Sequence, residues 1–140
     1  AHAGPRARVV IIGESLGCAV SIDLATDHRA AGLILEAPFA SIPHMARSIY
    51  PFLPASLLVR TRYDNLAKMP KVAMPVLVAH GTRDQVIPFA QGRTVFEAAR
   101  EPREFLPIDL AHHNDVYIVG GERYRNAIAA FIERVTPPLR

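Results

Sequence analysis

The amino-acid sequence predicts an α/β fold built on a mostly parallel sheet of about four strands, with flanking helices on both faces. Short apolar runs recur along the chain and are continuous rather than alternating, which is typical of strands buried on both faces of a parallel sheet. Segments whose apolar residues have helical spacing lie between these runs or follow them. The chain has 140 residues, 50% of them hydrophobic, so we expect a single domain over residues 1–140.

The first strand and helix open the predicted fold. The strand is expected over Ala7–Ile12 and the helix over Leu16–Ala25. A second buried strand covers Gly32–Leu35, and Pro38 ends it because proline cannot donate a hydrogen bond to a neighbouring strand. This strand–helix–strand order predicts two parallel strands.

A proline-rich segment at about residues 39–72 follows the second strand. A proline inside a helix removes a backbone hydrogen bond, so this segment cannot form one long helix. We expect an insertion of short helices that caps the carboxyl ends of the strands. Its apolar residues are expected either to pack on the sheet or to line a pocket, and the sequence favours neither. The prolines are Pro43, Pro51, Pro54 and Pro70.

Two more strands and two helices complete the pattern. The third strand is expected over Met74–Gly81, and a shorter, more polar outer strand over Arg103–Ile108. Helices are expected over Pro88–Arg100 and Glu122–Val135. This alternation of strands and helices supports a parallel sheet that is covered on both faces.

The segment Gly13-Glu14-Ser15-Leu16-Gly17 lies between the first predicted strand and the first predicted helix. One interpretation is a tight turn in which Ser15 caps the helix. The other is a nucleophile elbow, a strained strand-to-helix turn that exposes a serine hydroxyl and needs small residues two positions before and after it. Gly13 and Gly17 meet that requirement. The choice depends on whether an acid and a base follow.

An acid and a histidine do follow Ser15, each at the end of a later predicted strand. Asp84 lies just beyond the third strand and His113 just beyond the fourth. An imidazole can take the serine proton, and a carboxylate can hold that imidazole in the correct tautomer. We therefore expect Ser15 as nucleophile, Asp84 as acid and His113 as base, with the backbone N–H of Leu16 donating to an oxyanion.

Other roles for neighbouring residues stay open at this point. Asp84 could instead be a turn residue that caps the following helix. Glu36, at the end of the second strand, is an alternative acid, and His112 is an alternative base. His112, His113 and Asp115 lack a matching distant pair of ligands, so we expect no metal site.

Four segments carry a resemblance to a known family. They are GESLGCAV, LILEAPFAS, YDNLAKMPKVAMPVLVAHGTRDQVIPFAQG and HHNDVY, and they span nearly the whole chain. The chain resembles the C-terminal part of an α/β hydrolase, in the bud-emergence-suppressor-like branch of the serine hydrolases. The resemblance implies Ser15, Asp84 and His113 as the catalytic triad, and it favours His113 over His112 and Asp84 over Glu36.

The family resemblance also implies an activity. Its members are esterases, lipases and acyl-thioesterases, so we expect cleavage of carboxylic esters or thioesters through an acyl-enzyme, with a small-molecule or lipid acyl ester as substrate. Peptide cleavage is a lesser variant, and no cofactor is implied. The alternative is a non-catalytic fragment or degenerate module that acts in binding or assembly.

The family resemblance also implies segments that we expect to be absent from this sequence. The family's fold has further strands ahead of the one at Ala7–Ile12, and the loop that supplies the second oxyanion donor is among the missing segments. We expect the first strand to be an apolar, unpaired edge through which the chain associates with itself. An upstream anchor or signal stays open for the same reason.

Composition excludes several other classes of function. The net charge of +3 comes from arginines spread along the chain without a block of like charges, so we expect no nucleic-acid binding. No apolar run approaches the roughly 18 residues that a membrane span needs. The single cysteine, Cys18, lies in an apolar stretch and is expected to be a buried thiol. Localisation stays undecided, with a slight preference for the cytoplasm.

Overall fold

Four parallel strands form one sheet in the order β1–β2–β3–β4 in the computed structural model, which describes residues 9–43, 45 and 63–137. Each strand pairs in parallel with the next along the chain, and Ile34 of the second strand lies beside Ile12 and Leu77 of its neighbours. The predicted parallel sheet of four strands is confirmed. The strands are β1 (Val10–Glu14), β2 (Gly32–Glu36), β3 (Val76–Gly81) and β4 (Arg103–Ile108).

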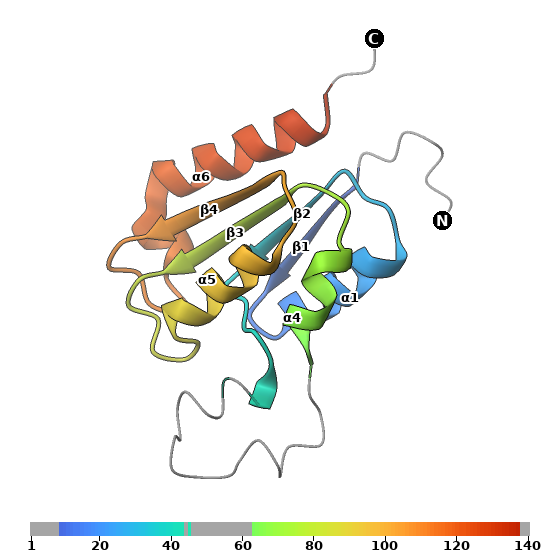
Figure 1. The fold of residues 1–140 in the computed structure, drawn as a ribbon. Helices are drawn as coiled ribbons and strands as arrows, with labels where there is room; N and C mark the ends of the chain where they lie inside the picture. Colours follow the sequence, from blue (N-terminus) through green and yellow to red (C-terminus); the bar gives the residue numbers. More distant parts are fainter. Residues whose placement is uncertain (1–8, 44, 46–62, 138–140) are drawn as a thin grey trace.

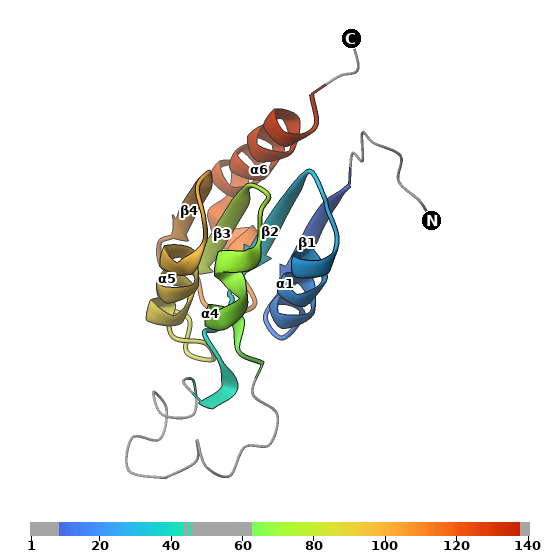
Figure 2. The ribbon, with the colours of Figure 1, turned by 45° about the vertical axis from the view of Figure 1, so that its right-hand side comes forward.

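The helices lie on both faces of this sheet (Figure 1). One face carries α1 (Gly17–Asp27), the short α4 (Asn65–Lys68) with the 3-10 helix η1 (Met69–Lys71), and α5 (Phe89–Ala98). The opposite face carries α6 (Val116–Val135), as the turned view makes clear (Figure 2). Connections between sequentially adjacent parallel strands have one hand, which places α1 and α5 on the same side.

Alternate residues of the central strands face two separate apolar cores. Leu33 and Leu35 of β2 pack with residues of α1 and α5, whereas Ile34 packs with residues of α6, including Phe131. These central strands are therefore apolar at successive positions, although their side chains alternate in direction. This double burial explains why the apolar runs are continuous in the sequence.

β1 differs from its prediction in position and in burial. It covers Val10–Glu14 rather than Ala7–Ile12, because pairing with β2 continues as far as Glu14 beside Glu36. Residues 7 and 8 lie outside the described part of the chain. The expectation of burial on both faces is wrong for β1, because Ile12 is 60% exposed. Among the described residues β1 pairs only with β2, so it is an edge strand of the sheet.

α1 is longer than predicted, and α5 is shorter. α1 runs past Ala25 to Asp27. α6 spans Val116–Val135, but the non-helical backbone of Gly121, where φ is 50° and ψ is −130°, interrupts it. The helix after this break agrees with the predicted Glu122–Val135, whereas the turns from Val116 to the break were not predicted. The α5 helix covers Phe89–Ala98 within the predicted Pro88–Arg100.

Most of the predicted cap cannot be compared, because residues 44 and 46–62 lie outside the described residues. The end of the predicted insertion packs in the core instead of forming a cap. Met69 and Val72 are fully buried with the side chains of α1 and α5. Asn65 ties both ends of the insertion together, since its side-chain amide donates to the Phe39 carbonyl over 2.7 Å.

Candidate active site

Ser15 lies on a tight turn between β1 and α1, in a strained backbone conformation. Its φ is 51°, in the left-handed region that L-residues rarely adopt. The Ser15 N–H donates to the Glu36 carbonyl of β2 over 2.9 Å, which fixes the turn against the neighbouring strand. The Ser15 side chain does not cap α1. Leu16 occupies the N-cap position, and no side chain makes a capping hydrogen bond there. A strained turn between a strand and a helix is what the nucleophile-elbow interpretation requires.

Gly13 and Gly17 differ in whether a larger residue would fit in their place. A Cβ on Gly13 would lie 2.5 Å from Ser21 Oγ and 2.9 Å from the Cys18 Cα, so only glycine lets α1 approach β1 this closely. A Cβ on Gly17 would meet no described atom within 4 Å. The expected need for a small residue is therefore supported at Gly13, while nothing in the described structure requires a glycine at Gly17.

Asp84 lies in the turn after β3, and hydrogen bonds hold both of its carboxylate oxygens. Oδ1 accepts the backbone N–H groups of Val86 and Ile87, each over 2.8 Å. Oδ2 accepts Nδ1–H of His113 over 2.7 Å. The two interpretations of Asp84 are thus compatible, because one oxygen organises the turn and the other faces the histidine.

His113 joins the acid to the serine. It lies in the loop between β4 and α6, and its Nε2 is 3.0 Å from Ser15 Oγ while its Nδ1 is bound to Asp84. Ser15, His113 and Asp84, which are far apart in the sequence, therefore form one continuous set of contacts at the carboxyl ends of the strands. His112 is exposed, and its backbone N–H donates to Asp115 Oδ1 over 2.6 Å. The structure brings His113, not His112, to the serine.

The hydrogen bonds keep Asp84 charged. Burial by itself raises the pKa of this carboxyl, but hydrogen bonds from His80, His113 and the backbone outweigh burial and lower its pKa to about 2. Asp84 is therefore an anion across the physiological pH range, which suits a partner for an imidazolium.

Glu36, the alternative acid, has a different partner. Its carboxylate accepts the hydroxyl of Tyr124 in α6 over 2.5 Å, and burial raises its pKa. Its backbone carbonyl also accepts the thiol of Cys18 over 3.2 Å, so Glu36 supports the elbow through its main chain. Cys18 is fully buried, as expected, and burial raises the pKa of its thiol. Sequence reasoning missed Tyr124, which lies 88 positions from Glu36.

The Leu16 N–H lies directly after the nucleophile, at the start of α1. The first amide groups of a helix have no acceptor within the helix, so this N–H can donate to an oxygen that develops negative charge beside Ser15. The polar groups at this edge of the sheet thus are a hydroxyl, an imidazole, a carboxylate and a helix amide. These groups suit acyl transfer.

A small hollow of about 230 Å³ lies beside the histidine. It is formed by the loops that follow β3 and β4, and it adjoins His113 itself. The residues that line it are Gln85, Val86, His112, His113, Asn114 and Asp115.

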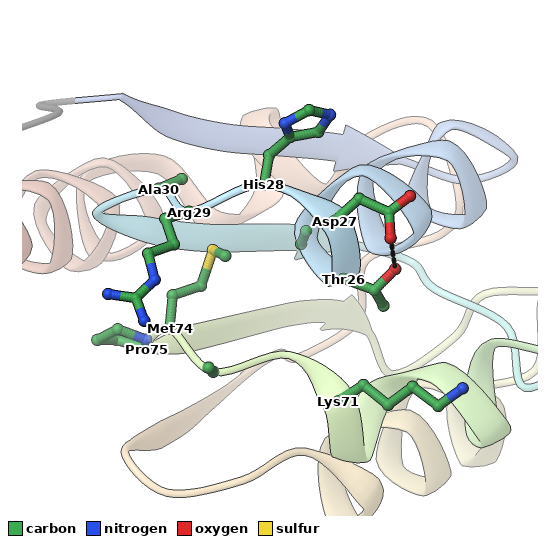
Figure 3. A pocket seen from close by; sticks show the side chains of 10 residues that line it. Thr26, Asp27, His28, Arg29, Ala30, Lys71, Met74 and Pro75 are labelled. Atoms are coloured by element: carbon green, nitrogen blue, oxygen red, sulfur yellow. Dashed lines mark hydrogen bonds between the residues drawn. The ribbon is translucent and has the colours of Figure 1, made fainter. Parts of the chain in front are cut away.

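A larger pocket of about 540 Å³ lies at the other end of the sheet, where β2 and β3 begin (Figure 3). Its polar side chains do not converge: Arg29 extends toward Pro75, whereas His28 and Lys71 point away from each other. The pocket shares no lining residue with the hollow beside His113. It therefore does not belong to the candidate active site.

The described residues contain neither a cluster of metal ligands nor a membrane-spanning helix. No three histidine, cysteine or acidic side chains in this part of the chain come together as metal ligands. No helix within residues 9–43, 45 and 63–137 has the length and apolarity to cross a membrane.

The chain is similar in sequence to several longer proteins. It is 33% identical over 126 residues to an uncharacterized protein of Mycobacterium tuberculosis, a match that covers 90% of this chain and 45% of that protein. It is 34% identical over 130 residues to human alpha/beta hydrolase domain-containing protein 17B, covering 90% of this chain and 42% of the relative. The chain thus spans less than half the length of these relatives. No protein-family profile matches it.

Solved structures share the fold. The esterase domain of a Rhodothermus marinus protein superposes with a TM-score of 0.66 at 21% identity, covering 89% of this chain and 59% of that chain. A monoacylglycerol lipase from Paleococcus ferrophilus gives a TM-score of 0.68 at 19% identity, covering 92% and 69%. Both the relatives named as α/β hydrolases and these structures agree with the parallel sheet and its flanking helices. The chain therefore has the fold of the α/β hydrolases and is similar to part of each of these relatives.

Proposed function

We propose that this protein is a serine hydrolase that cleaves carboxylic esters or thioesters through an acyl-enzyme. The observation that carries the proposal is the continuous set of contacts from Asp84 Oδ2 to His113 Nδ1, over 2.7 Å, and from His113 Nε2 to Ser15 Oγ, over 3.0 Å. Both distances lie within the range for a general base and its nucleophile.

Each of these groups has a defined role in acylation. His113 Nε2 takes the hydroxyl proton as Ser15 Oγ bonds to the substrate carbonyl carbon, and the carbonyl oxygen becomes an oxyanion. The Leu16 N–H donates to that oxyanion, and Asp84 stabilises the imidazolium of His113. The carbonyl then re-forms, the bond to the leaving oxygen or sulfur breaks, and His113 returns the proton to the leaving group.

Deacylation repeats these steps with water. His113 takes one proton from water while the water oxygen attacks the acyl carbon, and the tetrahedral adduct collapses with release of a carboxylic acid. The proton on His113 returns to Ser15 Oγ, which restores the starting state. No group outside the substrate, water and these side chains is needed for the balance.

The names of the structural neighbours support the substrate class. They include an esterase, a monoacylglycerol lipase and an acylaminoacyl peptidase, all of which act at an acyl carbon. Esters and thioesters have better leaving groups than amides, so a site with one identified oxyanion donor is expected to favour them. A purely non-catalytic module would not need the strained Ser15 backbone or the contacts to His113.

A fluorophosphonate probe tests this proposal, because it labels only an activated serine. We expect labelling of the protein at Ser15, located by peptide mass spectrometry. Ser15→Ala should abolish labelling, whereas Ser21→Ala, a matched serine on α1 whose hydroxyl bonds to the Ile12 carbonyl, should retain it. A folded protein that the probe does not label would contradict the proposal.

The two adjacent histidines provide a second comparison. His113→Gln should slow labelling and ester hydrolysis by roughly 10³-fold or more, because the nucleophile loses its base. His112→Gln should leave both rates close to those of the unmodified protein, since His112 makes no contact with Ser15 in the described structure. Equal losses in the two variants would show that His113 has no special role.

A further inference from the structure

His80 is a second histidine at the Asp84 carboxylate, and the triad does not use it. It lies on β3, four positions before Asp84, and is fully buried. Its Nε2 is 2.9 Å from the Ile87 carbonyl oxygen and 3.3 Å from Asp84 Oδ2. Asp84 Oδ2 is the same oxygen that accepts Nδ1–H of His113.

The surroundings of His80 determine which of its nitrogens donates. The Ile87 carbonyl and the Asp84 carboxylate can only accept, so Nε2 must carry a hydrogen. Nδ1 is buried and has no hydrogen-bond partner among the described residues. The nitrogen of His80 that donates toward the Asp84 turn is therefore Nε2.

The neighbouring helix α5 holds the His80 ring in this place. A Cβ on Gly92 would collide with His80 Nδ1, so the helix backbone packs directly against the ring. The ring of Phe89 meets it edge-on, with centroids 5.7 Å apart. The Nε2–H group is therefore held rigidly between the Ile87 carbonyl oxygen and Asp84 Oδ2, and such a fixed place is what a positioning group requires.

We propose that His80 is a positioning residue of the candidate active site: its Nε2–H holds the Asp84 carboxylate so that Oδ2 faces His113. This inference rests on the proposed hydrolase function. Oδ1 is already fixed by the turn, but Oδ2 would otherwise depend on His113 alone. His113 changes its charge twice in each half-reaction, whereas His80 exchanges no proton with the substrate and donates throughout. It keeps the acid oriented while the base moves its proton.

Charged groups near these histidines come from three elements. Asp84 follows β3, Glu36 ends β2 and interacts electrostatically with both His80 and His113, and Glu14 ends β1 beside Glu36. Neither glutamate accepts a hydrogen bond from His80 in the described structure, since both of its Nε2 contacts are to the Asp84 turn. The effect of a substitution at His80 should therefore be transmitted by Asp84.

Two substitutions separate positioning from packing. His80→Gln keeps an N–H donor near the place of Nε2, and His80→Leu fills similar space without a donor. We expect His80→Leu to lower kcat for p-nitrophenyl butyrate about tenfold with little change in KM, and His80→Gln to restore most of it. Gly92→Ala, which displaces the ring but keeps the histidine, should lower kcat as His80→Leu does.

The titration of Asp84 gives a readout that does not need activity. His80 is one of the groups that lower the pKa of Asp84, so its carboxyl should titrate at higher pH in His80→Leu and near its original value in His80→Gln, followed by ¹³C NMR of the carboxyl carbon. A folded His80→Leu variant with the original kcat and the original Asp84 titration would overturn the inference. So would equal losses in His80→Gln and His80→Leu.

The same set of measurements distinguishes this inference from the proposed function. If the unmodified protein neither hydrolyses the ester nor reacts with a fluorophosphonate, the hydrolase proposal fails, while the Asp84 titration still shows whether His80 acts on the carboxylate. If the protein is active but His80→Leu changes neither readout, only the role of His80 fails. Should His80→Leu not fold, the comparison of Gly92→Ala with His80→Gln decides in its place.

Discussion

Asp84 connects the chemistry of the site to the stability of the fold. Its carboxylate accepts hydrogen bonds from two backbone amides and from His113, and His80 lies close to the same oxygen. These donors hold the pKa of the folded carboxyl at about 2, below its ordinary value of 3.8. A depressed pKa means that the anion stabilises the folded state above the ordinary value and that this stabilisation is lost as the pH falls toward 2.

We therefore predict an acid-sensitive component of stability that belongs to Asp84. Between about pH 5 and pH 2 the free energy of unfolding should fall by about 2 kcal/mol through this group. Asp84→Asn cannot ionise, so its stability should start lower and lack this component. Urea unfolding at a series of pH values measures the difference. Asp109→Asn, at an exposed aspartate, is the matched control and should keep the slope of the unmodified protein.

Among the elements, the contact between β1 and α1 depends on a single glycine. Gly13→Ala would bring a Cβ against Ser21 Oγ and the backbone of Cys18, so we predict a loss of about 1–3 kcal/mol in the free energy of unfolding. Gly17→Ala meets open space and should leave stability unchanged or slightly raised. Urea unfolding of the two variants tests this, and similar values for both would contradict the packing explanation.

The strands and helices differ in how well the sequence predicts them. β4 has the predicted bounds, Arg103–Ile108, because polar residues and a proline at its ends limit the apolar run. The helix after Gly121 agrees with its prediction, whereas the turns of α6 before Gly120 and Gly121 were missed. Residues 65–71 form short helices, as expected of the insertion, but Met69 fills space between α1 and α5, which no local pattern reveals.

The residues of the candidate site also differ in how well the sequence predicts them. Ser15, Asp84 and His113 could be chosen from the sequence because each follows a predicted parallel strand, and such ends meet at one edge of a sheet. Spacing alone did not separate His112 from His113, because adjacent residues in a loop differ only in where their side chains point, and the family resemblance favoured His113. The contact of His80 with Asp84 could not be predicted from the sequence, since it depends on how the β3 turn and α5 pack together.

At the scale of the whole molecule, the edge of the sheet formed by β1 is apolar and unpaired within the described residues. Only one side of β1 is paired within the described residues, and Ile12 is 60% exposed there. The adjacent helix α1 adds the exposed side chains of Leu16, Val20 and Leu24. An unpaired apolar strand offers a row of backbone donors and acceptors to another strand. The other edge strand, β4, is more polar and carries Arg103 and Glu104.

We predict that this 140-residue chain associates with itself through β1, and that a charge on this edge weakens the association. Ile12→Lys should shift sedimentation-velocity profiles toward the monomer, because a lysine on an edge strand is costly to bury in a new strand pair. Ile118→Lys places the same charge on α6, at a side chain that is 77% exposed, and should leave the profiles unchanged. If both variants reduce association equally, general surface charge and not the β1 edge controls it. If the unmodified chain stays monomeric over the whole concentration series, the prediction of association through β1 is wrong.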